Sequence, residues 1–413
     1  MTDRLLELSS QTWFRKTIKQ LGLPIPTPQV LRRREGPLAM RSLEGLDVLV
    51  SPGGGRLDPW VARALAEGGA SVTLVGVETL PRPWREASEA YSRATKVCNS
   101  DSGLDDVDAL VFDASELKTP SQLDALYSFF QPRIRHLKTS GRVLVLGRSP
   151  DGVKDPIVAS THAALEGFIR SVAKEIGAKG ATAHVVYCQA RSGAEMPALI
   201  RFLMSSDSAF ITGQPWTLQP TPSHLTDWDH RRPLDSRIAL VTGAARGIGA
   251  ATAEALSEQG AKVICLDRPD DEINLNAMAE RIGGFAFEAD VTDLRTPKRL
   301  REYVMAQFGG IDIVVHNAGV TRDKTLARMS SEQWETAVNV NLDSVLRIDG
   351  ELLNGPMRNG GRAVYLSSVA GLAGNLGQTN YATSKAGIAG YVRALAPRMA
   401  KMGVTANAIA PGF

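Results

Sequence analysis

A tyrosine and a lysine near the C-terminal end of the chain have the spacing of a proton-transfer pair. Tyr381 and Lys385 are four residues apart in the segment Tyr-Ala-Thr-Ser-Lys. The alanines within and after this segment favour a helix, on which residues four apart share a face. An ammonium group beside a tyrosine favours the phenolate form. Together with Ser368 upstream, the pair predicts a site that moves a proton onto a carbonyl oxygen.

A glycine-rich segment in the same half of the chain could hold a dinucleotide. Residues 243–249 read Gly-Ala-Ala-Arg-Gly-Ile-Gly, follow the apolar strand predicted at 238–241 and precede a helix. Glycines let the backbone approach a pyrophosphate, and the N-terminus of the helix offers free N–H groups. The order of strand, turn and helix is the context that a dinucleotide site requires. Combined with the proton-transfer pair, this segment indicates a carbonyl reductase.

The residue at the end of the next predicted strand bears on the choice of dinucleotide. Residues 262–266 form that strand, and Asp267 follows it. A carboxylate there can bond both ribose hydroxyls of NAD and repels the 2′-phosphate of NADP. Arg246 and Arg268 act in the opposite sense, because either can pair with that phosphate. We therefore expect NADH to be preferred and NADPH to be possible.

Further motifs of the second half resemble those of the short-chain dehydrogenase/reductase family, and within it the 3-oxoacyl-[acyl-carrier-protein] reductases. The matching motifs run from Thr242 to Gly412 and cover nearly all of that half. Besides the glycine-rich segment they are Asp290-Val291, Asn317-Ala318-Gly319, the continuation at 320–323, and Pro411-Gly412.

The resemblance implies a role for each matching residue. Asn341, Ser368, Tyr381 and Lys385 match the catalytic tetrad of the family. Ser368 would hold the substrate carbonyl oxygen, Asn341 would keep a water that connects Lys385 to solvent, and Lys385 would also bond the nicotinamide ribose. No metal ligands are expected. The residues implied to bind the cofactor are Gly243, Arg246, Gly247, Ile248, Gly249, Asp267, Asp290, Val291, Asn317, Ala318, Gly319, Lys385, Pro411 and Gly412.

The implied reaction is hydride transfer from NAD(P)H to a 3-oxoacyl thioester of CoA or acyl carrier protein, which yields the 3-hydroxyacyl thioester. The nearest alternatives are an acetoacetyl-CoA reductase and a 3-hydroxyacyl-CoA dehydrogenase working in the reverse direction. A non-catalytic nucleotide-binding or scaffold protein is an alternative of another class. The intact tetrad favours the enzyme. The chain stops at Phe413, before the substrate lid, last helix and last strand of the family, so we expect an incomplete C-terminal end.

The chain is predicted to contain two related α/β halves. Strand and helix signals alternate from about Leu46 and start again near Arg237, as in parallel sheets with crossover helices. A shift of 191 residues places Leu49-Val50 on Leu240-Val241. We expect two tandem doubly wound, Rossmann-like domains, the first degenerate and flavodoxin-like. The predicted parts are an N-terminal helical arm (1–45), the degenerate domain (46–219), a linker (220–236) and the catalytic domain (237–413).

The first half keeps the apolar strand positions and loses the chemical ones. Asp58, for example, places a carboxylate where a pyrophosphate would sit. A tandem chain of this kind resembles the high-molecular-weight oxoacyl reductases of bacteria. We expect a structural and oligomerising role for this half, with binding of CoA or an acyl carrier as the alternative. The residues aligned with the predicted site are Pro52, Arg56, Asp58, Gly76, Asp113, Ser115, Arg148, Val158, His162, Cys188 and Gln189.

The composition narrows the possible partners and compartment. The 413 residues are 43% hydrophobic and carry a formal net charge of +3, so we expect a globular protein without a nucleic-acid partner. No apolar run approaches the ~20 residues that span a bilayer. Three scattered cysteines fit a reducing compartment. We expect a cytoplasmic protein without membrane contact that forms a homodimer, in which the degenerate half covers the helices after the fourth and fifth strands of the catalytic half.

Overall fold

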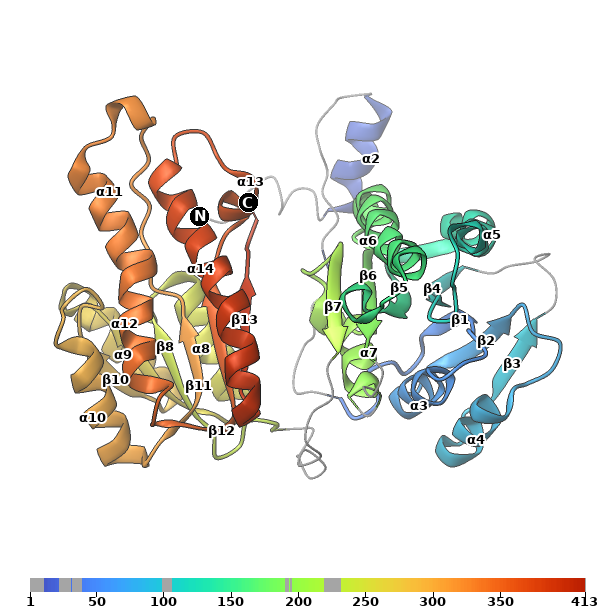
Figure 1. The fold of residues 1–413 in the computed structure, drawn as a ribbon, viewed down its shortest axis with the longest axis horizontal. Helices are drawn as coiled ribbons and strands as arrows, with labels where there is room; N and C mark the ends of the chain where they lie inside the picture. Colours follow the sequence, from blue (N-terminus) through green and yellow to red (C-terminus); the bar gives the residue numbers. More distant parts are fainter. Residues whose placement is uncertain are drawn as a thin grey trace. The chain divides into compact units, whose positions relative to one another are not determined.

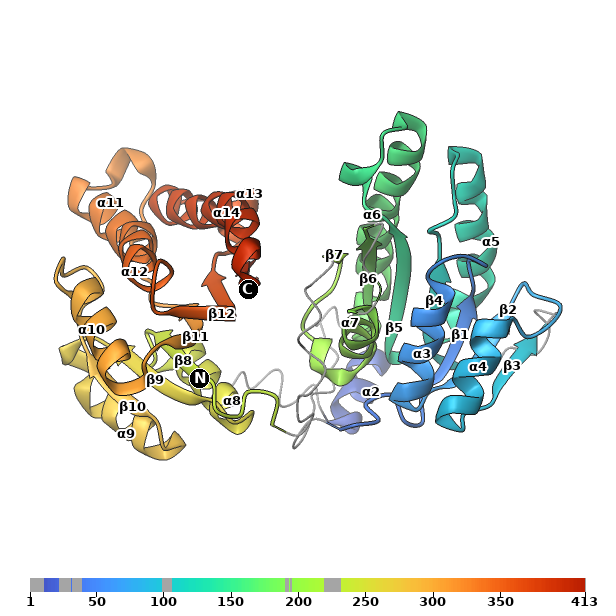
Figure 2. The same ribbon diagram turned by 60° about the horizontal axis from the view of Figure 1, so that its bottom comes forward.

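The computed structural model describes residues 11–21, 31, 39–98, 106–189, 193, 195–218 and 232–412. The chain divides into two units, Met1–Thr221 and Pro222–Phe413, and each is built around its own sheet (Figures 1 and 2). Among the described helices, none has the length and apolar character needed to cross a membrane.

Unit 1 is a seven-stranded parallel sheet between two layers of helices. Helices α3, α4 and α7 share one core cluster with the sheet, and α5 and α6 share the other. The strands are β1 (Asp47–Ser51), β2 (Ser71–Val75), β3 (Thr95–Cys98), β4 (Val107–Asp113), β5 (Leu137–Arg148), β6 (Thr182–Cys188) and β7 (Gln214–Leu218). The helices are α2 (Thr12–Gln20), α3 (Asp58–Gly68), α4 (Arg82–Tyr91), α5 (Asp124–Arg133), α6 (Pro156–Ile176) and α7 (Met196–Met204).

The short strand β3 decides how the sheet of unit 1 is classified. Its strand order is β3-β2-β1-β4-β5-β6-β7, which begins as the Rossmann order does. Without β3, the remaining strands would follow the flavodoxin order. The complete sheet of unit 1 therefore has the Rossmann-like order. The flavodoxin-like order that we expected fits only the strands that remain when β3 is left out.

Unit 2 is a six-stranded parallel sheet of order β10-β9-β8-β11-β12-β13. Helices α8 and α9 cover one face, and α10, α12 and α14 cover the other. The strands are β8 (Ile238–Thr242), β9 (Lys262–Asp267), β10 (Phe285–Glu288), β11 (Ile311–His316), β12 (Met357–Leu366) and β13 (Thr405–Ile409). The helices are α8 (Gly247–Glu258), α9 (Glu272–Ile282), α10 (Thr296–Phe308), α11 (Ser331–Val338), α12 (Ser344–Leu352), α13 (Val369–Ala373) and α14 (Thr379–Met399), with a π-helical turn at Asn339–Asp343.

The two units repeat the same contact at the amino edge of their sheets. In unit 1, Asp108 accepts a hydrogen bond from the backbone N–H of Asp47 at 3.0 Å. In unit 2, Asp312 accepts one from the N–H of Ile238 at 2.9 Å. The register also shifts at the start of β4–β5 and at the start of β11–β12. Two sheets that share such details support the tandem relationship expected from the sequence.

In each unit, a few residues before the first strand already pack with the core. Leu43 donates from its backbone N–H to the carbonyl of Gly68 at 2.8 Å, and Leu234 makes the matching bond to Gln259 at 3.0 Å. Leu43 is also fully buried in the core of unit 1. The end of the expected arm and the end of the expected linker therefore pack with the sheets that follow them. Helix α2 is the described part of the helix expected near the N-terminus, and most of the expected linker lies outside the described residues.

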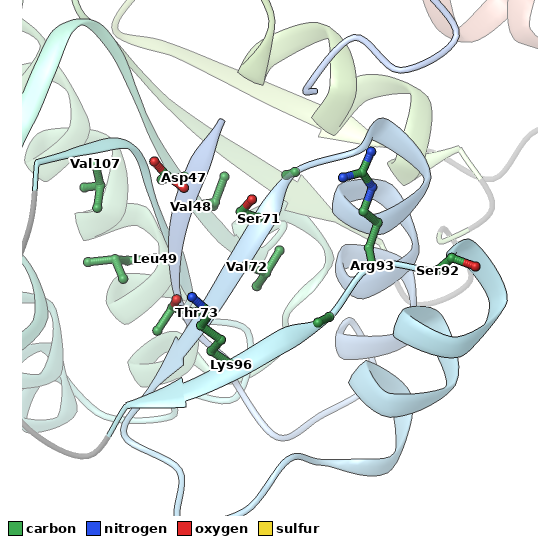
Figure 3. Close-up of a pocket in the computed structure, with 12 residues that line it drawn as sticks. Asp47, Val48, Leu49, Ser71, Val72, Thr73, Ser92, Arg93, Lys96 and Val107 are labelled. Atoms are coloured by element: carbon green, nitrogen blue, oxygen red, sulfur yellow. The ribbon is translucent and has the colours of Figure 1, made fainter. Parts of the chain in front are cut away.

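The crossover between the third and fourth strands differs between the units. In unit 2 it contains α10, whose Leu300 and Val304 are buried against the sheet. In unit 1 only residues 99–106 separate β3 from β4, a shorter stretch than the 13 residues of α10 alone. A cavity of about 340 Å³ lies there against β1, β2 and β3, and Asp47 and Val107 at the starts of their strands help to line it (Figure 3). This cavity is at the amino ends of the strands, away from the edge that carries the chemistry in unit 2.

Candidate functional site

The predicted site residues of unit 2 lie at the carboxyl edge of its parallel sheet. Parallel strands end at the same edge, so loops that are distant in sequence meet there. The residues that end or follow successive strands are Gly243 after β8, Asp267 at the end of β9, Asp290 after β10, Asn317 after β11, Ser368 after β12 and Pro411 after β13.

The turn after β8 requires glycine at two positions. Gly243 has a positive φ of 70°, and a side chain on it would lie 2.9 Å from the Cα of Ala318. A side chain on Gly249 would lie 1.9 Å from the carbonyl oxygen of Gly243. Asn317 holds this turn from the next loop, since its side-chain amide donates to the carbonyls of Thr242 and Gly243, both at 3.0 Å. The turn thus presents bare backbone of the kind that can approach a pyrophosphate.

The start of α8 follows this turn directly, and the loop after β10 lies two strands away along the same edge of the sheet. Gly247 begins α8 with a positive φ of 61°, and the Ile248 side chain after it is exposed. Asp290 is held in its loop because its carboxylate accepts from the N–H and the hydroxyl of Thr292, both at 2.7 Å. Val291 beside it is buried.

Asp267 is fixed at the end of β9 by two backbone hydrogen bonds. Its carboxylate accepts from the N–H of Ala245 and from the N–H of Arg268, both at 2.9 Å. The side chains of Arg246 and Arg268 lie 3.6 and 3.4 Å from the carboxylate of Asp271. Arg246 and Arg268, which could pair with a 2′-phosphate, are therefore both paired with the Asp271 carboxylate in this structure. Asp271 is an acidic residue of this region that the sequence analysis did not single out.

Tyr381 and Lys385 lie on the first turns of α14, as their spacing predicts. The ammonium nitrogen of Lys385 is 5.7 Å from the centre of the Tyr381 ring. It donates to the backbone carbonyl of Leu366, at the end of β12, at 2.7 Å. Lys385 is only 4% exposed, and this burial lowers the pKa of its ammonium to about 8. The lysine can therefore change its charge close to neutral pH while it stays beside the phenol.

Asn341 joins the loop after β11 to α14. It is buried in the π-helical turn, where its carbonyl oxygen accepts from the N–H of Val320 at 2.8 Å and its amide donates to the Val320 carbonyl at 2.9 Å. The amide also donates to Ser384 at 3.1 Å, and Ser384 donates to the backbone carbonyl of Tyr381 at 2.8 Å. A side chain on Gly319 would lie 3.1 Å from the Asn341 oxygen. The side chain of Asn341 is thus committed to holding the loop.

Ser368 lies beside the turn at Pro411-Gly412. It caps helix α13, and the N–H of the next residue, Val369, donates to the carbonyl of Pro411 at 3.1 Å. Ser367 is buried, and its hydroxyl donates to the backbone carbonyl of Lys385 at 2.7 Å. The end of β12 is therefore bonded both to α14 and to the loop after β13. These contacts bring the predicted serine to the edge that also carries Lys385.

Comparison with known proteins agrees with this geometry. A family model described as short chain dehydrogenase matches residues 237–413. The 3-oxoacyl-[acyl-carrier-protein] reductases FabG of Vibrio cholerae and of Escherichia coli strain K12 are each 42% identical over 183 residues, which are 44% of this chain and 74% of theirs. Nodulation protein G of Azospirillum brasilense is 40% identical over 185 residues, 44% of this chain and 75% of its own. The chain belongs to the short-chain dehydrogenase/reductase family.

Two buried polar residues of this reductase domain were missed by the sequence analysis. Ser384, described above, links Asn341 to the helix of Tyr381. Asn380 is completely buried; its amide donates to the carbonyls of Arg322 and Gln333 at 3.0 and 2.9 Å, and its oxygen accepts from the N–H of Tyr381 at 2.7 Å. The only local signal was a polar residue directly before the tyrosine. Its partners are 47 and 58 residues away, so no local pattern could reveal them.

In unit 1 the corresponding edge is occupied by the protein's own side chains. A side chain on Gly53 would lie 2.6 Å from the carboxylate of Asp113, which replaces Asn317. Burial raises the pKa of this carboxyl to about 6. Arg148, which replaces Ser368, pairs with Glu116 at 2.7 Å. Carboxylates and an ion pair therefore stand where unit 2 has bare backbone and Ser368.

We expect one dinucleotide site per chain. Asp58 begins α3, where a pyrophosphate would need the free helix terminus, and the Arg148–Glu116 pair closes the substrate side. Isothermal calorimetry of the full chain with NADH should give a stoichiometry of one, and Gly243→Val should abolish it. Two sites of similar affinity, or binding that survives Gly243→Val, would contradict this assignment of the site to unit 2.

Proposed function

We propose that this chain reduces a 3-oxoacyl thioester of acyl carrier protein or CoA to the 3-hydroxyacyl thioester. The observation that carries the proposal is the buried Lys385 beside Tyr381, at the sheet edge that also bears the glycine turn. Relatives that are 42% identical over this domain are named as 3-oxoacyl-[acyl-carrier-protein] reductases, which supports the substrate class.

The residues of unit 2 divide the work of the reaction. When bound, a reduced nicotinamide supplies the hydride that the carbonyl carbon accepts. Ser368 and Tyr381 hold the carbonyl oxygen, and the Tyr381 hydroxyl gives its proton to that oxygen as the C–O double bond becomes a single bond. The Lys385 ammonium stabilises the phenolate that remains. The chain's glycines at 243 and 249 admit the pyrophosphate, so no side chain has to move.

Unit 1 is assigned a structural role in this proposal. The same strand order is kept, while carboxylates and an ion pair fill the edge that would bind a ligand. We further propose that the chain forms a homodimer, as the resemblance to tandem oxoacyl reductases implies. Light scattering at micromolar concentration should give twice the chain mass, and a stable monomer would rule the dimer out.

Tyr381→Phe should remove the proton donor and keep the aromatic ring. Because general acid–base groups contribute about 10² to 10⁴ in rate, we expect a loss of that size in kcat with acetoacetyl-CoA or a longer 3-oxoacyl thioester. Calorimetry should show unchanged dinucleotide binding. The matched control is Tyr303→Phe, which changes a tyrosine of α10 that packs on Phe287 of β10. Near-normal turnover by Tyr381→Phe would refute the mechanism.

The pH dependence of reduction should follow the charge of Lys385. Its pKa is lowered to about 8, so in the free protein the ammonium is charged below that pH and loses its charge as the pH rises through it. Since the charged form supports proton transfer, kcat/KM for reduction should be level at lower pH and fall above about 8. Lys385→Arg, which keeps its charge, should lower the rate and remove this fall. A profile that is flat from pH 7 to 10 in the parent protein would contradict the assignment.

NADH should be preferred over NADPH because of Asp267. Its carboxylate is held at the ribose end of the site, and a 2′-phosphate would meet a second negative charge there. Asp267→Ala should narrow the ratio of kcat/KM values between the two dinucleotides, and Asp267→Asn should do so while keeping the side-chain shape. If the parent protein already favours NADPH strongly, Asp267 does not set the preference.

A further inference from the structure

A buried polar network lies behind the candidate site in unit 2. His316 and Asp349 are in contact through the ring Nε2 and a carboxylate oxygen at 2.8 Å, and the Tyr365 hydroxyl donates to the other carboxylate oxygen at 2.6 Å. The three side chains are 3%, 2% and 0% exposed. We call these three residues the carboxylate network. Burying a carboxylate costs free energy unless hydrogen bonds compensate it. The bonds from His316 and Tyr365 therefore stabilise the buried Asp349 carboxylate.

The carboxylate network joins the ends of two strands that lead into the site. His316 and Tyr365 are opposite each other in the β11–β12 pairing, and their rings stack at 5.1 Å. His316 is directly followed by Asn317, which holds the glycine turn. Tyr365 is three residues before Ser368. A shift of the His316 and Tyr365 rings would therefore also move Asn317 and Ser368, which are only one and three residues further along the chain.

The same network reaches α12, which follows the turn of Asn341, and α14, which carries Tyr381 and Lys385. Asp349 lies on α12, which continues from the turn that holds Asn341. Tyr391 lies on α14 with Lys385, and its ring meets that of Tyr365 at 5.9 Å, edge to face. Burial, and then the nearby Asp349 carboxylate, raise the pKa of the Tyr391 hydroxyl, so it remains a donor. Asp349 on α12 is thus bonded to the ends of β11 and β12, and the Tyr365 ring extends the contact to α14.

Unit 1 shows that this fold does not need polar residues at these positions. Phe112 and Val145 are opposite each other in β4–β5 as His316 and Tyr365 are in β11–β12. Phe129 of α5 packs on Phe112 with ring centres 5.5 Å apart, in the place that Asp349 of α12 takes. All three are buried in an apolar cluster. At these three positions unit 1, whose carboxyl edge is filled by side chains, has apolar residues. Unit 2, which carries the tetrad, has a hydrogen-bonded carboxylate there.

We propose that His316, Asp349 and Tyr365 are positioning residues for the reaction, which set Ser368 and the loop after β11 against Tyr381 and Lys385. This proposal rests on the proposed function of unit 2. Directional hydrogen bonds define one arrangement of strand ends and helices, whereas packed hydrocarbon tolerates small shifts. A reaction that needs carbonyl, phenol and hydride donor in line is sensitive to such shifts.

The first experiment removes one hydroxyl from the full chain. Tyr365→Phe keeps the stacked ring and deletes the bond to Asp349, and Tyr303→Phe is the control, because no described residue is bonded to the Tyr303 hydroxyl. We expect Tyr365→Phe to lower kcat by about 10-fold or more, since a misplacement of 1 Å can cost about 10²-fold. The dinucleotide Kd should stay the same, and Tyr303→Phe should leave kcat unchanged. A lower melting temperature with unchanged kcat would overturn the proposal.

A double-mutant cycle separates positioning from a general loss of order. If Tyr365 acts through Ser368, Tyr365→Phe should have little further effect on kcat once Ser368→Ala is present. Fully multiplicative effects would show that the two residues act independently and would reject the mechanism. Replacing the network by the unit 1 residues (His316→Phe, Asp349→Phe and Tyr365→Val together) should leave a folded protein that binds NADH and turns over slowly. Normal turnover by that folded variant would also overturn the proposal.

Hydrogen exchange distinguishes this proposal from the proposed function. If the parent chain reduces neither acetoacetyl-CoA nor longer 3-oxoacyl thioesters, the proposed function fails. The amides of Val320 and Val369, bonded to Asn341 and Pro411, should still exchange faster in Tyr365→Phe than in Tyr303→Phe if the network positions these loops. Equal exchange in the two variants would refute the network's role whatever the activity.

Discussion

The parallel pairing of the strands is the constraint on which the site of this protein depends. Each strand of unit 2 runs in the same direction as its neighbours, so the chain must return through a crossover after every strand. All carboxyl ends then lie at one edge, and residues from 243 to 412 come together without being near in sequence. Backbone groups at strand ends and helix N-termini lack regular partners. At that edge these groups are available to solvent, to a ligand or to side chains of the protein.

The two units differ at this edge. Unit 2 keeps Gly243 and Gly249 bare and uses the Asn317 amide to hold the turn from behind. Unit 1 brings Asp113 against Gly53 and closes the neighbouring loops with the Arg148–Glu116 pair. The amino edges of both sheets keep the same aspartate-to-backbone bond. Both units therefore share the scaffold, and they differ in whether the turn at the carboxyl edge is left bare or is met by a carboxylate.

The cores of the two units also differ in the buried charged side chains that they contain. In unit 2, Lys385 and Asp349 are almost fully buried, and each is compensated by bonds to named partners. In unit 1, the positions that match His316 and Asp349 are Phe112 and Phe129, whose rings pack against each other in a tilted arrangement. Hydrocarbon is the less costly way to fill such a space. Its replacement by a bonded carboxylate in the unit with the tetrad is the physical basis for assigning that carboxylate to positioning.

Local sequence patterns were sufficient for the strands, the glycine turn and the spacing of Tyr381 and Lys385, because each depends on residues within one turn or one strand. The two-unit organisation was also visible, since a repeated order of strands leaves a repeated order of apolar residues. The tertiary structure decided what local patterns do not contain. Asn380 and Ser384 are hydrogen-bonded to residues far along the chain. Asp271 forms ion pairs with Arg246 and Arg268. His316 contacts Asp349, which is 33 residues away in sequence. Such pairs depend on strand register and on the rotation of helices over the sheet, and both are set only when the whole core packs.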